Sequence, residues 1–432
     1  MKNCRKWIAW LLAVVTLCLC LTGCDEGLDN EGRKIINVWH YWDDSESAFN
    51  RDIQKAVDDY QSRHPELLIS LHTLPENEYR SKLGTSFSEE GGKEIDIFAF
   101  WGGYQTENLQ ELELLLPLNN YITDEIRGRV FEGGFSAFDQ KDQIYALPAY
   151  SWASVLYCNT ALFEQYELAI PETLEDVAAA SKVFAEAGLT PLALGERDGW
   201  QLNMLFESIL LRTTGADNVS AFLDGETGLA DGAEFETATE LFKAFQSNGA
   251  LGEIPAAEDA QAADDTFLQG EAAMRLTGSW LVDRIKSTDD EELARKIKTI
   301  PFPKVTVENQ SYGSLEESVG GYSHSFFVNN RTKHKDASAE LCIYLSEVLG
   351  NSAEENGCGY SAWTKEPTGE TELERGISKM TKESSSLIPS WDIFLSSQKV
   401  DDYVTCVSDV FNEEITTLEF LNKLKHLVEE AE

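Results

Sequence analysis

Tryptophans placed next to turn residues or carboxylates are the side chains of this sequence best suited to binding chemistry. They are Trp42 (before Asp43 and Asp44), Trp101 (before two glycines), Trp152, Trp200, Trp280, Trp363 and Trp391. A flat indole ring covers the apolar face of a sugar, and a carboxylate accepts hydrogen bonds from neighbouring hydroxyl groups. The same side chains would bind a polyamine through cation–π contacts and ion pairs. A single tryptophan is more often a packing residue, so the indication of binding comes from the set.

Motifs of the common enzyme classes are absent from the sequence. It contains no GxSxG, no HExxH, no P-loop and no GxGxxG after a strand. The six histidines are scattered, and none is paired at metal-ligand spacing. A pair of carboxylates could serve a glycosidase, but 75 Asp and Glu residues make adjacent pairs common by chance. We therefore expect no catalytic residue, no metal site and no cofactor.

Alternating strands and helices position the first of these tryptophans. Strands are predicted at 35–40, 67–71 and 94–100. Between the first two, apolar residues recur at helical spacing up to Pro65. Such βαβ units form parallel sheets, whose ligands bind beyond the carboxyl ends of the strands. Trp42 and Trp101 both fall there.

A second α/β region is predicted after Pro148. Its strands are expected at 153–157 and 272–276, with a late strand at 326–328, and Ser279 is expected to cap the helix after Gly278-Ser279-Trp280. Helices are expected at 161–166, after Pro171-Glu172-Thr173, and at 201–213, 234–248, 262–269 and 336–349, followed by a helical tail. No internal repeat is visible.

Length, charge and the N-terminal segment limit the class of protein. A chain of 432 residues is long for one core, so two lobes are expected. The net charge of −40 argues against nucleic acid as a partner. Residues 1–23 have the basic start and apolar run of a signal peptide, and Leu21-Thr22-Gly23-Cys24 is typical of a bacterial lipobox. Cys24 would then carry the lipid, and the polar segment 24–33 would be a flexible tether.

Four cysteines remain in the mature chain: Cys158, Cys342, Cys358 and Cys406. The sequence cannot select among their three possible pairings. Apolar neighbours favour buried free thiols at Cys158 and Cys342.

Several segments, in this order, resemble the bacterial extracellular solute-binding proteins of carbohydrate-uptake ABC transporters. They are INVWHYWDD, EIDIFAFWGGYQTENLQELELLLPLNNYI, DQIYALPAYSWASVLYCNTALFEQYELAIPETLEDV, FLQGEAAMRLTGSW and GGYSHSFFVNNRTKHKDASAELCIYLSE. The resemblance implies an α/β periplasmic-binding-protein-like fold of class II. Two lobes, 34–149 plus 323–350 and 150–322 plus 351–432, would be joined by hinge crossovers around a ligand cleft.

The resemblance also implies roles for individual residues. Trp42, Asp43 and Asp44 match the first-strand loop that contacts sugar, and Trp101 matches a stacking platform. Trp280 would stack from the second lobe. The remaining candidates are Tyr150 and Trp152 at the first crossover, Gly321 and Tyr322 at the return crossover, Asp198 and Trp200 as second-lobe contacts, and Trp363 and Trp391 in the tail.

These implied roles describe a lipid-anchored receptor on the outer face of the cell membrane. It would be a monomer that closes on an oligosaccharide and then engages a membrane-embedded ABC permease. Lys and Arg are scarce in the candidate loops, with Arg197 the main exception, so a neutral sugar is expected. Asp43-Asp44-Ser45 stands where maltodextrin-binding relatives often have a lysine, which argues against a maltose preference. The alternatives are a binding protein for a cationic solute such as a polyamine, and a surface carbohydrate-active enzyme.

Overall fold

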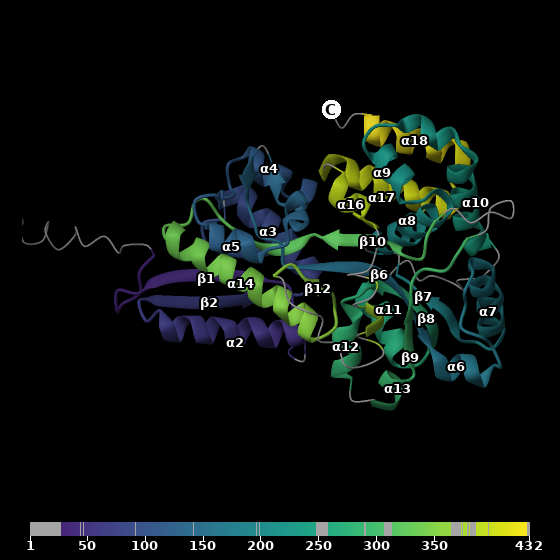
Figure 1. Cartoon of the computed structure of the whole chain (residues 1–432), viewed down its shortest axis with the longest axis horizontal. Helices are drawn as coiled ribbons and strands as arrows, with labels where there is room; N and C mark the ends of the chain where they lie inside the picture. The colour runs from purple at the N-terminus through teal and green to yellow at the C-terminus, as the bar shows by residue number, and fades with distance from the viewer. Residues whose placement is uncertain are drawn as a thin grey trace, which may run out of the picture.

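Two separate β-sheets, each flanked by helices, form the two lobes seen in the computed structural model (Figure 1). The structure describes residues 27–429 except 44, 46, 91, 141, 196, 198, 248–257, 289–290, 306–312, 364–372, 374, 378–379, 381–385 and 396. The predicted signal segment 1–23 and the lipidation residue Cys24 lie outside the described residues. The α/β class and the two-lobe architecture predicted from the sequence are confirmed.

The first sheet has the strand order β11-β3-β1-β2. β1 pairs in parallel with β2 and β3, and β11 arrives late in the chain to pair antiparallel with β3. The strands are β1 (Lys34–His40), β2 (Leu67–Thr73), β3 (Ile97–Trp101) and β11 (His324–Val328). Around them lie α2 (Ala48–Arg63), α3 (Glu76–Glu90), η1 (Gly103–Thr106), α4 (Glu107–Glu111), α5 (Asp124–Arg129), η2 (Glu132–Ala137) and the hairpin β4 (Asp139–Gln140) and β5 (Gln143–Ile144).

Helix α2 shows how local periodicity builds this lobe. Phe49, Ile53, Val57 and Tyr60 are buried on one face, as their spacing predicts. The helix ends at Arg63, two residues before the proline predicted to close it.

The second sheet has the strand order β13-β10-β6-β8-β7, with β9 and β12 also pairing with β6. Its strands are β6 (Tyr150–Asn159), β7 (Thr190–Ala193), β8 (Ala272–Gly278), β9 (Ile297–Ile300), β10 (Glu317–Tyr322), β12 (Tyr360–Ser361) and β13 (Ser386–Ile388). Its helices are α6 (Thr160–Gln165), α7 (Leu174–Glu186), α8 (Trp200–Thr214), α9 (Ala216–Leu223), η3 (Thr227–Asp231), α10 (Ala233–Ser247), α11 (Ala260–Leu268), α12 (Leu281–Ser287), α13 (Glu291–Arg295), α16 (Trp391–Phe394), α17 (Ser397–Phe411) and α18 (Thr417–Glu429).

Three details differ from the sequence predictions. Trp101 is the last residue of β3 and pairs with His324, rather than lying beyond the strand. Ser279 does not cap α12, because its hydroxyl donates to the carbonyl oxygen of Cys358 and the helix begins after Trp280. The tail is not wholly helical, since the short strands β12 and β13 are added to the second sheet.

The chain passes between the lobes at three places. β6 begins at Tyr150, and only Ser323 separates β10 of the second sheet from β11 of the first. Helix α14 (Lys335–Glu355) packs on α2 and β11 of the first lobe and on β6 and β12 of the second (Figure 1). At the second passage, a side chain at Gly320 would clash with the Trp152 carbonyl oxygen of the paired strand.

Part of the predicted tether is structured. Within 27–33, the Asp29 carboxylate accepts hydrogen bonds from the backbone and the Nε of Arg33, at 2.8 and 2.7 Å. The Gly27 carbonyl oxygen lies 2.7 Å from Nε2 of His334. These residues are therefore fixed to the first lobe and are not a free coil. Cys158, Cys342, Cys358 and Cys406 are all buried and form no disulfide within the described residues, which confirms the prediction of buried free thiols at Cys158 and Cys342.

Candidate functional site

Aromatic rings from both lobes meet around His324, the first residue after the Ser323 crossover. The His324 ring lies 5.6 Å from Trp101 of the first lobe. It lies 6.2 Å from Trp280 and 6.5 Å from Trp152, both of the second lobe. It stacks on Tyr150 at 5.7 Å, with 17° between the planes. We call these five residues the interlobe cluster. Trp101 and Trp280, which were predicted to face each other across the cleft, are thus both neighbours of His324.

Strand register and small residues position the cluster. Trp101 pairs with His324 across β3 and β11, and Trp152 pairs with Gly321 across β6 and β10. The Trp152 Nε1 donates a 2.8 Å hydrogen bond to the Ser323 hydroxyl. Trp280 follows β8 and folds back over Gly278, where any side chain would clash with the indole. The ring positions therefore follow from backbone pairing at the crossover.

Both faces of the Trp101 indole are covered by protein. Tyr41 stacks on it at 4.8 Å with 12° between the planes, and the Arg80 guanidinium carbon lies 3.7 Å from the ring centre. These distances leave no room for both groups on one face. With 6% of its surface exposed, Trp101 offers no free face for a sugar in this conformation.

Other candidates keep accessible surface. Trp42, Trp200, Trp280 and Tyr322 are partly exposed, and Asp43 is exposed. Trp200 lies 5.9 Å from Trp280, so two accessible indoles of the second lobe adjoin each other. Trp42 lies 4.5 Å from Tyr41, which links it to Trp101. Asp44 and Asp198 lie outside the described residues, and Gly321 is partly exposed beside Tyr322.

Other side chains cover the rings of the two tail tryptophans. Trp363 is buried under the Arg129 guanidinium, 5.5 Å from its ring. Trp391 is 1% exposed and packs on Phe222 and Tyr403, with ring centres 5.5 and 5.2 Å away. Both are packing residues here, because tertiary contacts cover their rings.

A buried carboxyl group explains the position of Trp391. Glu207 of α8 accepts hydrogen bonds from the Ser390 hydroxyl (3.0 Å), the Trp391 amide (3.1 Å) and the Tyr403 hydroxyl (2.9 Å). Burial, and secondarily the charge of Asp392, raise the pKa of Glu207 to about 8. The contact fixes α16 to the core of the second lobe.

Tyr41, Arg80 and His324 were not predicted as site residues from the sequence. Burial, and secondarily the Arg80 charge, lower the pKa of His324 to about 3, so its ring is neutral at physiological pH. Arg80 follows β2, in the first turns of α3, at the sheet edge where ligands of parallel sheets bind. That rule, applied to β2 as well as to β1 and β3, would have found it.

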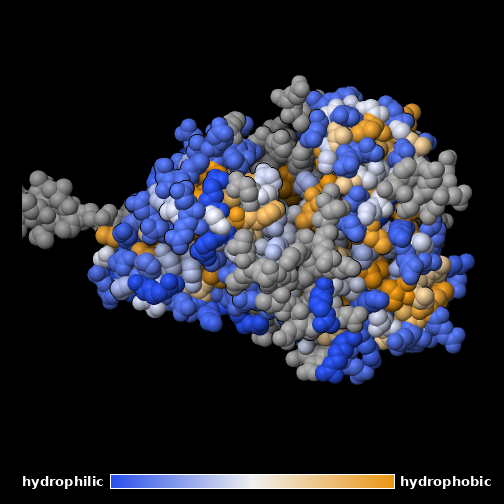
Figure 2. Space-filling model, in the orientation of Figure 1, coloured by the Kyte–Doolittle hydropathy of each residue, from blue (hydrophilic) through white to orange (hydrophobic). Residues whose placement is uncertain are grey.

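Direct contacts join the lobes beside the cluster. The Asp283 carboxylate of α12 accepts hydrogen bonds from the Ala48 amide of α2, at 2.9 Å to Oδ1 and 3.1 Å to Oδ2. Gly103 approaches the Ile393 carbonyl so closely that a Cβ there would clash. The structure therefore shows the two lobes in direct contact beside the cluster. Figure 2 shows a hollow between them at the top of the view, with hydrophobic surface at its floor.

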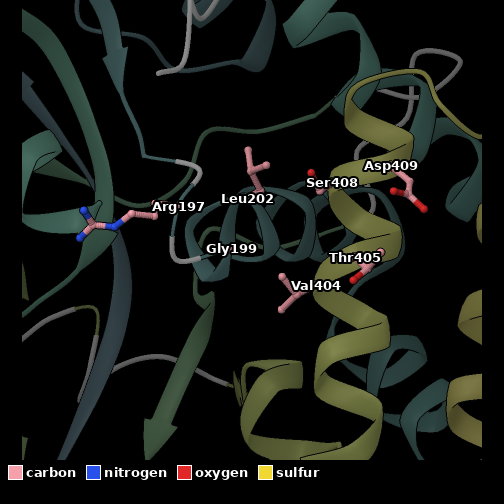
Figure 3. Close-up of a pocket in the computed structure, with 7 residues that line it drawn as sticks. All are labelled: Arg197, Gly199, Leu202, Val404, Thr405, Ser408 and Asp409. Atoms are coloured by element: carbon pink, nitrogen blue, oxygen red, sulfur yellow. The ribbon is translucent and has the colours of Figure 1, made fainter. Parts of the chain in front are cut away.

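A separate cavity of about 280 Å³ lies within the second lobe, between the start of α8 and α17 (Figure 3). Its lining is Arg197, Gly199, Leu202, Val404, Thr405, Ser408 and Asp409. The Arg197 side chain points away from α17, and its guanidinium pairs with Asp259. Among the described residues, no group of three or more His, Cys, Asp or Glu side chains could hold a metal ion.

The sequence profile of the family described as "Bacterial extracellular solute-binding protein" matches residues 43–346. The chain belongs to this family. It is a family of binding proteins, in agreement with the predicted lack of enzymatic activity. An uncharacterised ABC transporter extracellular-binding protein of Pyrococcus horikoshii is 22% identical over 72% of this chain and 68% of its own. A maltotriose-binding protein of Pyrococcus abyssi is 22% identical over 70% of this chain and 60% of its own.

Solved structures share the fold of this chain. One, from a study of xylan utilisation by Caldanaerobius polysaccharolyticus, has a TM-score of 0.80 at 24% identity, over 91% of this chain and 99% of that chain. A chitin oligosaccharide binding protein has a TM-score of 0.75 at 20% identity, over 92% of this chain and 98% of that chain. No helix in the described part of this solute-binding protein is long and apolar enough to cross a membrane.

Proposed function

We propose that this chain is the lipid-anchored substrate-binding protein of an ABC importer and that it binds a neutral oligosaccharide between its lobes. The observation that carries the proposal is the interlobe cluster, in which rings from both lobes gather around one residue of the crossover. A ligand held there would contact both lobes, which is the requirement for ligand-driven closure.

The accessible rings suit a saccharide. Trp280 and Trp200 offer adjoining apolar faces from the second lobe. Trp42 of the first lobe and Tyr322 at the crossover are also partly exposed. Asp43, exposed beside Trp42, supplies an acceptor for hydroxyl groups. The names of relatives that bind maltotriose and chitin oligosaccharide support the same ligand class.

Closure would be a hinge movement. The proposed lobes, 34–149 plus 323–350 and 150–322 plus 351–432, each keep their own sheet intact when the crossovers bend. A micromolar ligand supplies about −8 kcal/mol, which several ring contacts and hydrogen bonds can provide. The closed receptor would then present a surface to a membrane permease, with Cys24 holding it at the outer face of the membrane as a monomer.

A thermal-shift panel tests this function. Purified mature protein is heated with xylotriose, chitotriose, maltotriose, raffinose or spermidine. We expect at least one neutral sugar to raise the melting temperature, because a ligand at 100 times its Kd stabilises the folded state by about 2.7 kcal/mol. A shift with spermidine alone would refute the sugar assignment in favour of a cationic solute. Cleavage of an oligosaccharide during incubation would instead indicate an enzyme.

A further inference from the structure

Arg80 of α3 is a cation in direct contact with the interlobe cluster, through Trp101. Its guanidinium carbon lies 3.7 Å from the centre of the Trp101 ring, and its Nε donates to Glu76 Oε1 at 3.1 Å. The Arg80 side chain is 37% exposed. The guanidinium is therefore clamped between an indole below and a carboxylate at one edge, with solvent access on its remaining side.

The terminal amino groups of Arg80 have no hydrogen-bond partner among the residues that the structure describes. Only its Nε is engaged there, by Glu76. The Arg80 charge nevertheless acts across the interlobe space. It adds to the lowering of the His324 pKa by burial, and it partly offsets the burial that raises the pKa of Asp392. A flat guanidinium held by stacking and by one ion pair keeps two donors in fixed geometry at little further entropic cost.

The geometry points to Arg80 as a ligand-binding residue, with Trp101 as the positioning residue that supports it. This reassigns Trp101, which was predicted to stack on sugar. Its two faces are occupied by Tyr41 and Arg80. The donor pair of Arg80, rather than the indole face, would be what the first lobe offers to the ligand.

This inference rests on the proposed function and narrows the chemistry of the ligand. Two parallel N–H donors match two adjacent oxygen acceptors, either the hydroxyls of a vicinal diol or the oxygens of a carboxylate. Glu76 already neutralises the charge of Arg80. A ligand carboxylate would meet this negative charge, so the acceptors are assigned to the vicinal hydroxyls of a neutral sugar.

Isothermal titration of two Arg80 variants and one control variant tests the assignment, with the neutral sugars of the thermal-shift panel as probes. We expect Arg80→Ala to weaken binding about tenfold to a hundredfold, the range for hydrogen bonds to a charged group. Arg80→Lys keeps the positive charge but lacks the two parallel donors of the guanidinium, so it should retain only part of the wild-type affinity. Arg63→Ala is the matched control, because Arg63 also lies over aromatic rings of the first lobe, Tyr60 and Tyr344, yet lies at the end of α2.

A double-mutant cycle separates support from direct stacking. If Trp101 acts through Arg80, the double variant with Trp101→Ala and Arg80→Ala should bind sugar almost as well as Arg80→Ala alone. Trp101→Phe in the wild-type background should keep most of the affinity. Additive losses would overturn the positioning role. Unchanged or tighter sugar binding by folded Arg80→Ala would overturn the whole inference. Tighter binding of a glucuronic-acid-substituted xylo-oligosaccharide than of xylotriose would overturn the neutral-diol assignment.

The failure of the proposed function gives a different result. If wild-type protein binds none of the neutral sugars, the function and this inference both fail. If wild-type protein binds a sugar and the Arg80 variants bind it equally well, only the inference fails.

Discussion

Asp283 should contribute to ligand affinity although it lies outside the interlobe cluster, because it caps a helix of the other lobe. Its carboxylate accepts two hydrogen bonds from Ala48, the first residue of α2. Helix α2 has no acidic residue in its first turn, and its N-cap residue Ser47 makes no side-chain capping bond. The negative charge that a helix N-terminus favours therefore comes from the opposite lobe, and only when the lobes are closed.

The expected size of the effect follows from capping energies. Loss of an N-cap side chain costs about 1 kcal/mol, and a charge at a partly buried helix end is worth up to about 2 kcal/mol. Asp283→Ala should thus destabilise the closed state by about 1–2 kcal/mol relative to the open one. When the ligand-free protein is mainly open, this cost appears in full as an affinity about five- to thirtyfold weaker for every sugar.

Titration calorimetry and small-angle scattering would measure both consequences. With saturating sugar, Asp283→Ala should still reach the compact radius of gyration of the wild type, but at higher sugar concentration. Asp176→Ala is the matched control, since Asp176 caps α7 within one lobe, at 3.0 Å from the Thr173 amide. It should lower the melting temperature without changing affinity. Wild-type affinity in folded Asp283→Ala would refute the reasoning.

Three further outcomes are expected. Trp280→Ala should weaken sugar binding by about 1 kcal/mol or more, the scale of a lost ring contact, whereas Trp391→Phe should leave affinity unchanged in a calorimetric titration. The raised pKa of Glu207 means that its stabilising effect is complete below its unfolded-state pKa and is lost as pH rises through about 8. Denaturant unfolding should therefore show stability falling between about pH 4.5 and 8, by at most about 1.4 kcal/mol per pH unit, and Glu207→Gln should flatten this slope. Cys24→Ala should release the protein from membranes into the medium, as followed by fractionation and by loss of radiolabelled palmitate, and its retention on membranes would argue against the anchor.

Local patterns explain what could be predicted of the fold. The apolar spacing of α2 extends over several turns, and the predicted strands of the first lobe extend over several residues. Elements of this length carry a strong periodic signal in the sequence. β12 and β13 have only two and three residues. Such short strands have no period of their own and exist because β6 and β10 pair with them.

The candidate site shows the same limit for single residues. Trp280 and Trp391 both stand beside turn residues in the sequence, yet one is partly exposed at the interlobe cluster and the other is in the core. Long-range packing on Phe222 and Tyr403 decides the second case. His324 was missed because its strand was predicted from its apolar residues alone, and its importance comes from its register with Trp101.

The late arrival of β11 has a consequence for how the protein is made. β3 waits for a partner that lies about 220 residues further along, which at ribosomal rates of about 5–20 residues per second takes about 10–45 s. During that time β3 is an unpaired edge of the first sheet, and the first lobe of the nascent chain is incomplete. An unpaired strand edge is a template for pairing with other chains, so the first lobe is most exposed to aggregation before β11 has been synthesised.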